Sequence, residues 1–551
     1  VNSTGAWFEN TLVENSTSTG VRMYYADSST TFRNLTVRNS GDPGQGPHEA
    51  GLAITWIFSS APVFDGLEIS GSVGHGIHSY KAEWIGNDFY LHNNSGDGVY
   101  LDYSSVDIDG LVVENNSESG AHLSDNIDTA LRNVTAHYNG LSGVTDEQKA
   151  GLFFDRSKTV SHPMLDVGCY SCTVTHSGGS GILIRDSADL WFNDVELSDN
   201  HPDHAPLDAD NSGLTLGQQG GIINIDGLTI DSEQNGATVH PAVLINQAAA
   251  SIHDLTMTGN HSGLQWDGQN HNNYPSQLSN SEFSGSGCIV LSNHHDLFGV
   301  GNTIAPECTG TVQLVNSQVN WSGFTDSSSS GTIIQLDSNS DLHLHQPVNV
   351  DLNLSYPSMA SGATIDVAYD LVVWVINNNS NGIPSANVDV IFSQFEPTLQ
   401  DSTNGLGYLT LTDFIGQRWT NSGSSPSTDA TISCGYDSVS NSTTATIDQD
   451  RFVNCVLPLE NQEPFLLWAT PVDIGVFISQ GPVEFNASDS WDLDDDELTF
   501  TWTSNLDGDI VASCTGQGVG NGQGITQQDM ANGAPFTVNT NYLNMGCQLS
   551  D

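Results

Sequence analysis

A glycine followed by a short, alternating apolar strand recurs along the first two-thirds of this chain. The shortest steps between copies are 21 to 25 residues. This period is typical of a solenoid, in which one repeat cannot bury its own apolar face and must stack on its neighbours. Clear copies begin at Gly20, Gly51, Gly76, Gly98, Gly120, Gly151, Gly181 and Gly213, and weaker ones at Gly263, Gly287, Gly310 and Gly331.

Each repeat contains a second strand, as at 32–37 and 108–113, that usually ends in Asn, Ser or Gly. The first and third residues after each leading glycine are mostly apolar, so alternation places them on one face. Gly and Asn supply the positive φ angles that tight corners need. No apolar period of 3.6 residues is evident, and helices should therefore be scarce. We predict an all-β chain whose residues 1–345 form a parallel β-helix.

This repeat resembles the right-handed parallel β-helix repeats of the pectate-lyase-like superfamily over residues 1 to about 345. The right-handed winding is implied by this resemblance and not by the periodicity. That superfamily includes lyases, glycosidases, adhesins and inert spikes, so the resemblance implies an architecture more firmly than an activity.

The repeat ends near His345, and two further modules are expected. Residues 346–463 carry longer alternating strands and resemble bacterial immunoglobulin-like repeats, which predicts a β-sandwich. Residues 464–551 resemble a PKD-type β-sandwich through the run from Phe485 to Trp502. The closing Gly-x-Tyr strand of that family is missing, which predicts a truncated module. Three carboxylates there could bind calcium, or could form a solvated acidic loop: Asp492, Asp494 and Asp496.

The charge balance restricts the partners. The chain has 11 basic and 65 acidic residues and a formal net charge of -54. Such a polyanion repels nucleic acid and anionic lipid, so no nucleic-acid partner is expected. No apolar run is long enough to span a membrane. The acid suits either a salty medium, as for a marine or halophilic microbe, or many weak calcium sites.

Eight cysteines fall into four sequence-local pairs. An even count with close partners predicts disulfides and an extracellular or cell-surface location. A redox motif or half of a zinc site is the alternative for the first pair. The predicted pairs are Cys169 with Cys172, Cys288 with Cys308, Cys434 with Cys455, and Cys514 with Cys547.

The coil register also predicts which side chains share an outer face. The second and fourth residues after each glycine point outward, and the next residue lies at a bend. Stacked coils lie about 4.8 Å apart, so these side chains form one column. Aromatic rings with polar neighbours suit sugars, although stacked rings could also simply shield the sheet. The candidate ligand-binding residues are Tyr24, Trp56, His78, Tyr80, Lys81, Tyr100, Tyr103, His122, Asp125, Arg185 and Asp186.

The same column offers candidate catalytic residues. Asp102 and Asp155 should lie two coils apart, about 10 Å, near the upper range for an inverting glycoside hydrolase. A polysaccharide lyase would instead need a carboxylate-bound cation and a base such as Arg156 or Lys81. His75 lies in a Gly-His-Gly that resembles the motif of polygalacturonases, whose other motifs are absent.

His/Asp clusters provide candidate metal ligands. His201, His204 and Asp208 lie in one insertion and would suit zinc or another transition ion. Two similar clusters contain His294, His295 and Asp296, and His343 with His345. In a chain with 18 histidines such clusters also arise by chance.

Three functions remain open from the sequence. The leading hypothesis is a secreted or surface protein whose solenoid is a rigid stalk and a carbohydrate-contacting or adhesive face. The second is a polysaccharide lyase or glycoside hydrolase that uses the same face. The third is a passive structural subunit that self-associates through the edges of its coils.

Overall fold

The computed structural model describes most of the chain up to residue 459. The described part is 5–459 without 27, 43–48, 58–60, 127, 158–166, 202, 212–221, 234–238, 269–275, 329–332, 351 and 353–357. Beyond residue 459 it describes the backbone of short strands only: β39 (Val483–Phe485), β40 (Glu497–Thr499), β41 (Trp502–Ser504), β42 (Gly508–Ile510), β43 (Thr537–Asn539) and β44 (Cys547–Leu549). The predicted calcium ligands Asp492, Asp494 and Asp496, together with Cys514 and the side chain of Cys547, lie outside the described residues.

The chain divides into two compact units. The first contains residues 1–367 and 418–424, and the second contains 368–417 and 425–551. The first unit therefore extends past residue 345, because β30 and the beginning of β31 still pair with the solenoid.

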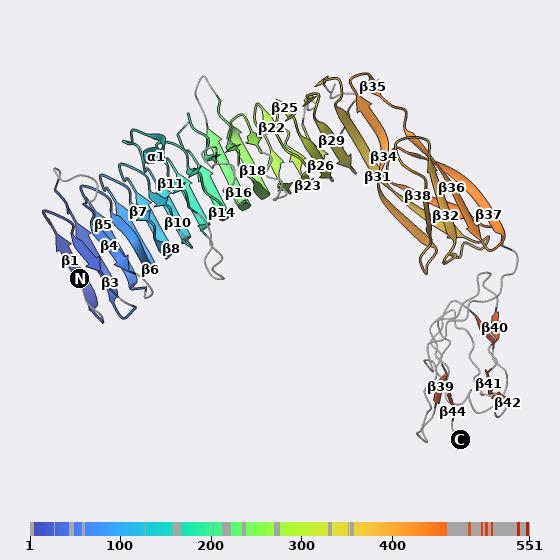
Figure 1. The fold of residues 1–551 in the computed structure, drawn as a ribbon, viewed down its shortest axis with the longest axis horizontal. Helices are drawn as coiled ribbons and strands as arrows, with labels where there is room; N and C mark the ends of the chain where they lie inside the picture. Colours follow the sequence, from blue (N-terminus) through green and yellow to red (C-terminus); the bar gives the residue numbers. More distant parts are fainter. Residues whose placement is uncertain are drawn as a thin grey trace. The chain divides into compact units, whose positions relative to one another are not determined.

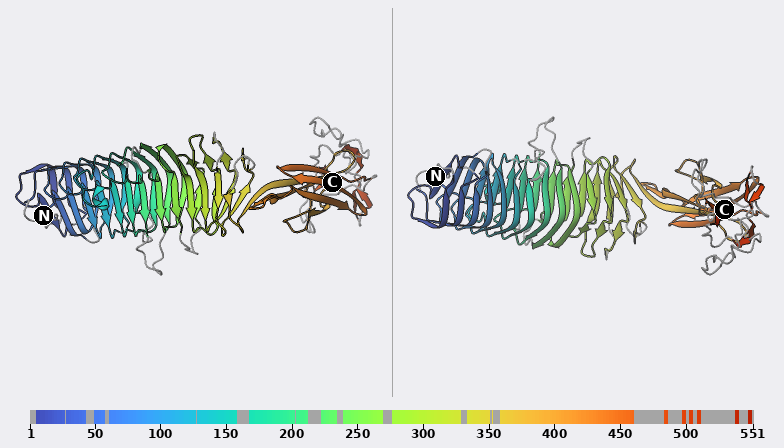
Figure 2. Two further views of the ribbon diagram at one scale, coloured as in Figure 1. Left: turned by 90° about the horizontal axis from the view of Figure 1, so that it is seen from above. Right: turned by 90° about the horizontal axis from the view of Figure 1, so that it is seen from below.

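The first unit is an all-β solenoid of about 13 turns with almost no helix, which confirms the predicted parallel β-helix. Successive turns stack in chain order (Figures 1 and 2). A first set of parallel strands, the short-strand sheet, follows the repeat glycines. Its members are β2 (Val21–Tyr24), β4 (Leu52–Ile57), the first part of β6 (Ile77–His92), β7 (Val99–Asp102), β9 (Ala121–Ser124), β11 (Leu152–Asp155), β13 (Ile182–Arg185), β15 (Leu207–Asp210), β17 (Val243–Asn246), β19 (Leu264–Asp267), β22 (Cys288–Ser292), β25 (Thr311–Val315), β28 (Ile333–Leu336) and β30 (Ser358–Met359).

The second set, the long-strand sheet, is parallel as well. Its members are β1 (Trp7–Glu14), β3 (Thr31–Arg38), β5 (Val63–Ser70), the later part of β6, β8 (Ser105–Glu114), β10 (Ala130–His137), β12 (Gly168–Thr175), β14 (Leu190–Ser198), β16 (Ile223–Glu233), β18 (Ala250–Asn260), β20 (Gln277–Ser279), β21 (Glu282–Phe283), β23 (Leu297–Val300), β24 (Thr303–Ile304), β26 (Gln318–Ser322), β27 (Thr325–Asp326), β29 (Asp341–His345) and β31 (Thr364–Ile376).

Corners in the left-handed backbone region separate the straight segments of a turn. In the turn of β8, for example, Tyr103 precedes the strand with φ 50°, Gly110 bends its middle with φ 76°, and Asn115 follows it with φ 54°. Glycine and asparagine tolerate this region, which is why they recur in the repeat. The corners let each turn fold back on itself while its strands pair with the turns on either side.

The interior is filled by apolar side chains and lined by polar ladders. Phe8, Phe32 and Phe64 stack from turn to turn with ring centroids 4.7 and 5.0 Å apart. At one corner the amides of Asn94, Asn116 and Asn139 are buried and form a ladder, because each Nδ2 donates to the next Oδ1 at 2.9 Å. Such ladders satisfy corner groups that water cannot reach.

The glycine register does not hold in every turn. From β22 onward Cys288, Thr311 and Ile333 lie level with Gly263, so the predicted copies at Gly287, Gly310 and Gly331 are out of register with the earlier ones. Two earlier short strands, β15 and β17, have no glycine before them. The predicted copy at Gly213 lies outside the described residues, and the short strand of that turn is β15, which follows Pro206. The next short strand, β17, follows Ala242. In both strands the first and third residues are apolar. The alternation of apolar and polar residues therefore sets the register of these strands even without a leading glycine.

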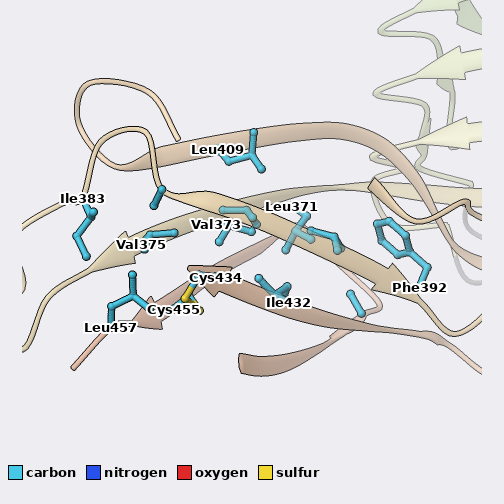
Figure 3. Packing of buried hydrophobic residues seen from close by; sticks show 14 of the residues in the cluster. Leu371, Val373, Val375, Ile383, Phe392, Leu409, Ile432, Cys434, Cys455 and Leu457 are labelled. Carbon is cyan, nitrogen blue, oxygen red and sulfur yellow. A yellow bond between two sulfur atoms is a disulfide. The ribbon is translucent and has the colours of Figure 1, made fainter. Parts of the chain in front are cut away.

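The described part of the second unit contains an antiparallel sheet in the order β33-β32-β36-β37. These strands are β33 (Leu399–Ser402), β32 (Asn387–Phe392), β36 (Thr428–Tyr436) and β37 (Val439–Ile447), and the unit also holds parts of β31 and β34 (Tyr408–Thr420), with β38 (Arg451–Val456). Aliphatic side chains such as Leu371, Val373 and Ile432 fill its core beside the Cys434–Cys455 disulfide (Figure 3). The short β35 (Gly423–Ser424) belongs to the first unit.

The disulfides Cys169–Cys172, Cys288–Cys308 and Cys434–Cys455 are formed as predicted. None of the helices in the described part of the chain is long and apolar enough to cross a membrane.

Candidate functional site

The outer face of the short-strand sheet carries the side chains that the repeat places in one column. The pairing aligns His78 with Tyr100, Tyr100 with His122, and His122 with Phe153. The fourth positions align in the same way, and Tyr80, Asp102, Ser124, Asp155 and Arg185 follow one another. Tyr24 lies farther toward the N-terminus, next to Thr55 of β4. The structure therefore brings the predicted column together, while its role stays a prediction.

The bend column consists of residues with positive φ. Their φ angles lie between 47° and 57°, and bulky side chains occupy five of the seven positions. This conformation costs a bulky residue roughly 1 kcal/mol, so packing of the side chains must hold it. The residues are Tyr25, Trp56, Lys81, Tyr103, Asp125, Arg156 and Asp186.

Three aromatic rings of this face surround one ammonium group. Lys81 Nζ lies 5.2, 4.9 and 5.4 Å from the ring centroids of Trp56, Tyr80 and Tyr103. Tyr80 meets each of the other two rings edge to face. A hydrogen bond with Tyr80 raises the pKa of Lys81. We call these four residues the lysine nest.

A ladder of rings runs beside the nest. Tyr100 lies between His78 and His122, with centroid distances of 5.3 and 4.8 Å, and His122 lies 4.5 Å from Phe153. His75 stacks on Tyr100 from the neighbouring turn at 4.9 Å. Burial, followed by the nearby charge of Asp102, raises the pKa of Tyr100 to about 12.

A buried carboxylate lies beneath this ladder. Asp97 Oδ2 is 3.2 Å from His75 Nδ1 and 3.6 Å from His122 Nδ1. Burial opposes the charge of Asp97, but hydrogen bonds from His122 and His75 outweigh it and hold the pKa of Asp97 well below its ordinary value. The backbone N–H of Asp97 also lies 3.1 Å from His75 Nδ1, and a nitrogen that accepts this N–H cannot donate to the carboxylate, so His122 is the donor that both tautomers of His75 allow. Asp97 thus orients His122, whose buried Nε2 has no hydrogen-bond partner in the described part of the chain.

Sequence reasoning gave Asp97 and Glu118 no role. They lie one and two residues before the repeat glycines Gly98 and Gly120, and only positions after each glycine were assigned to the outer face. A comparison of the residues that precede the glycines shows polar side chains at His75, Asp97 and Ser119. These polar residues at equivalent positions could have identified Asp97 from the sequence.

Asp102 lies at the centre of the face, in the rung between Tyr80 and Ser124. It is half-buried, and burial, then the charge of Asp125, raises its pKa. Within the described ranges, no hydrogen bond or ion pair is found for its carboxylate.

Two other acidic residues of the exposed face, Asp125 and Asp155, are held by arginine. Arg156 contacts Asp155 at 3.0 Å and Asp125 at 3.1 Å, and Asp155 also accepts from Ser124 Oγ at 3.3 Å. The hydrogen bond to Asp155 raises the pKa of Arg156, which argues against Arg156 as a base. The loop of α1 (Asp146–Lys149) then covers the column, and its Ala150 packs on Phe153 and Leu183. The exposed part of the face therefore lies on the N-terminal side of this loop, on β2, β4, β6, β7 and β9.

Two groups of three ligands are spaced for a metal ion among the described residues. The ligand atoms of His75, Asp97 and Glu118 lie within 4.8 Å of one another, and those of Asp226, His253 and Asp254 form an exposed group. Ligands at about 2.1 Å from a tetrahedral zinc ion lie about 3.4 Å apart, so the group of His75, Asp97 and Glu118 would bind such an ion only if its side chains moved closer together. It suits a metal-free histidine–carboxylate network.

The predicted metal ligands His201, His204 and Asp208 are not among those groups. Asp208 lies in β15, and both of its carboxylate oxygens accept hydrogen bonds from Arg185, at 3.1 and 3.0 Å. The rings of His201 and His204 lie 5.5 Å apart, and His204 Nε2 is 3.9 Å from Asp146.

A polar cavity of about 560 Å³ lies at the last turns of the solenoid. It brings together Asp296 and His343, which the sequence had placed in separate clusters, with Asn320 and Asp341. Its wall includes Arg418, whose guanidinium binds both carboxylate oxygens of Asp366, at 2.5 and 2.7 Å.

No family model, no curated protein and no solved structure matches this chain.

Proposed function

We propose that this chain is a secreted or cell-surface protein whose solenoid binds polysaccharide on the outer face of the short-strand sheet. The observation that carries the proposal is the lysine nest of Trp56, Tyr80, Tyr103 and Lys81, beside the ring ladder of Tyr100. Aromatic faces pack against the C–H faces of sugar rings, and adjacent polar groups bind hydroxyls. The rings are distributed over consecutive turns, which suits an extended ligand.

The setting of this face is also part of the proposal. We infer a right-handed solenoid of the pectate-lyase-like type, followed by an immunoglobulin-like sandwich and a PKD-like sandwich. The antiparallel sheet of the second unit supports the first of these modules. Three disulfides support an oxidising, extracellular compartment.

A glycan array with matched double variants tests the binding function. Tyr80→Ala with Tyr100→Ala removes one ring of the nest and the centre of the ladder, and we expect binding to be lost. Tyr90→Ala with Tyr138→Ala removes two exposed rings from elsewhere on the solenoid, and we expect binding to be unchanged. Equal binding by both double variants would show that this face is not the polysaccharide-binding site.

A second candidate function, glycoside hydrolysis, is favoured by two carboxyl groups of one column in different environments. Asp102 has a raised pKa and could donate a proton, whereas Asp155 is held by Arg156 and Ser124. Two rungs separate them, about 10 Å. An acid and a base on opposite sides of the scissile bond are what an inverting mechanism needs.

A lyase is supported less well by this face. It needs a cation to neutralise the carboxylate of a uronate, and Arg156 and Arg185 are already paired with aspartates. Incubation with neutral and acidic polysaccharides, with calcium supplied, separates the two reactions. Hydrolysis releases reducing ends, and its products do not absorb ultraviolet light, whereas the unsaturated product of a lyase does. The hydrolytic activity should be lost in Asp102→Asn. If no product formed from any of the substrates, both enzymatic functions would be rejected and the binding function would remain.

A further inference from the structure

The charges of the exposed face indicate which sugars it takes. We propose that the face, at Asp102, selects glycans that carry protonated amines and rejects uronate polymers. This inference rests on the proposed function, because it names the ligand class of the same face.

The first support is the environment of Asp102. Its half-buried carboxylate lies among aromatic residues, with Tyr80 in the adjacent rung and Tyr103 next along the chain. It has no hydrogen bond or ion pair within the described ranges, although half-buried carboxylates usually find a partner. An ammonium group placed there would supply that partner.

The second support is the lysine nest, which already holds an ammonium against Tyr80 and Tyr103. Those rings therefore present their negative faces to a cation on this side of the sheet. A hexosamine combines an ammonium with an apolar C–H face, and so matches both a carboxylate and a ring. Acetylation of the amine would remove the charge and the ion pair.

The third support is the state of the basic residues nearby. Arg156 pairs with Asp125 and Asp155, and Arg185 pairs with Asp208. Lys81 is engaged with the rings of the nest. A uronate carboxylate would therefore meet two arginines that are already paired and would have to compete with Asp102 for the charge of Lys81, on a chain of net charge -54.

The long-range charge of the chain attracts any polycation, so the test must separate that effect from Asp102. Short oligomers limit it, and calorimetric titrations with tetramers of glucosamine, N-acetylglucosamine and galacturonate compare the three ligand classes. Each titration is run at low and at high salt, because high salt screens the distant charges. Asp194→Asn is the matched control, since it removes one exposed carboxylate from a corner of the long-strand sheet, away from the face.

We expect wild type to bind the glucosamine tetramer about ten-fold more tightly than the acetylated tetramer, the range of one charge-assisted contact. Asp102→Asn should lose this preference, and Asp194→Asn should keep it at both salt concentrations. Asp102→Glu keeps the negative charge and should keep part of the preference for the glucosamine tetramer.

Other outcomes overturn the inference in distinguishable ways. An equal loss in Asp102→Asn and Asp194→Asn would attribute the preference to net charge. Another outcome is that the acetylated or the galacturonate tetramer binds tightly, in a way that depends on Tyr80 and Tyr100. That result would refute the selection of amines and would still support the proposed binding function. No binding by any tetramer, together with an empty glycan array, would refute both.

Discussion

The carboxylate of Asp97 lies 3.6 Å from Nδ1 of His122, buried beneath the ring ladder. This relationship fixes the orientation of an imidazole at the centre of the outer face. It also makes the ionisation of Asp97 part of the stability of the solenoid.

Acid should destabilise the solenoid partly through Asp97. Hydrogen bonds from His122 and His75 keep the pKa of the folded-state carboxyl below its unfolded value, which is about 3.9. Its contribution is therefore fully present above about pH 5 and is lost as the pH falls through 3.9 toward the folded pKa. Thermal melting of wild type and Asp97→Asn from neutral to acid pH checks this. The melting temperature of wild type should fall more steeply, and parallel curves would contradict the prediction.

The asparagine ladder should be a major source of cooperativity between turns. Asn116→Ala leaves the amides of Asn94 and Asn139 without one partner each, and we expect a loss of about 2 to 3 kcal/mol in the free energy of unfolding. Asn87→Ala, on the outward side of β6, should change it by less than about 0.5 kcal/mol. Urea titrations measure both, and similar midpoints for the two variants would show that the ladder is dispensable.

A repeat glycine should not tolerate a methyl group. A Cβ at Gly98 would lie 2.6 Å from the carbonyl oxygen of Gly120, which is backbone and cannot move aside. We expect Gly98→Ala to destabilise the solenoid by about 1 to 3 kcal/mol, the usual cost of overpacking. Gly405→Ala meets nothing within 4 Å and is the control. Differential scanning calorimetry should show a lower transition for the first variant alone.

The disulfide of the second unit should stabilise it chiefly by closing a loop. Cys434 and Cys455 are 21 residues apart, and a loop of that size gives about 3 kcal/mol in the chain-entropy model. Replacing both residues with alanine should lower the melting temperature of this unit and leave that of the solenoid unchanged. A shift of both transitions would mean that the two units unfold together.

The sequence by itself determined the solenoid and much of the register of its outer column. Strand alternation has a period of two, so the glycine repeat fixed which residues point outward, and Tyr100 and His122 lie in adjacent rungs as expected. Proximity in the chain was enough to pair the cysteines of the three disulfides that the described residues contain.

The tertiary structure decided what the column touches. Side chains that precede each glycine, such as Asp97, enter the site only because stacked turns bring corners of neighbouring repeats together. The pairing of Arg156 with Asp125, and the cover that α1 places over Phe153, depend on distances between turns and on an insertion. A local pattern specifies the direction of a side chain, whereas its partners are set by the packing between neighbouring turns, whose contacting residues are separated by a whole repeat in the sequence.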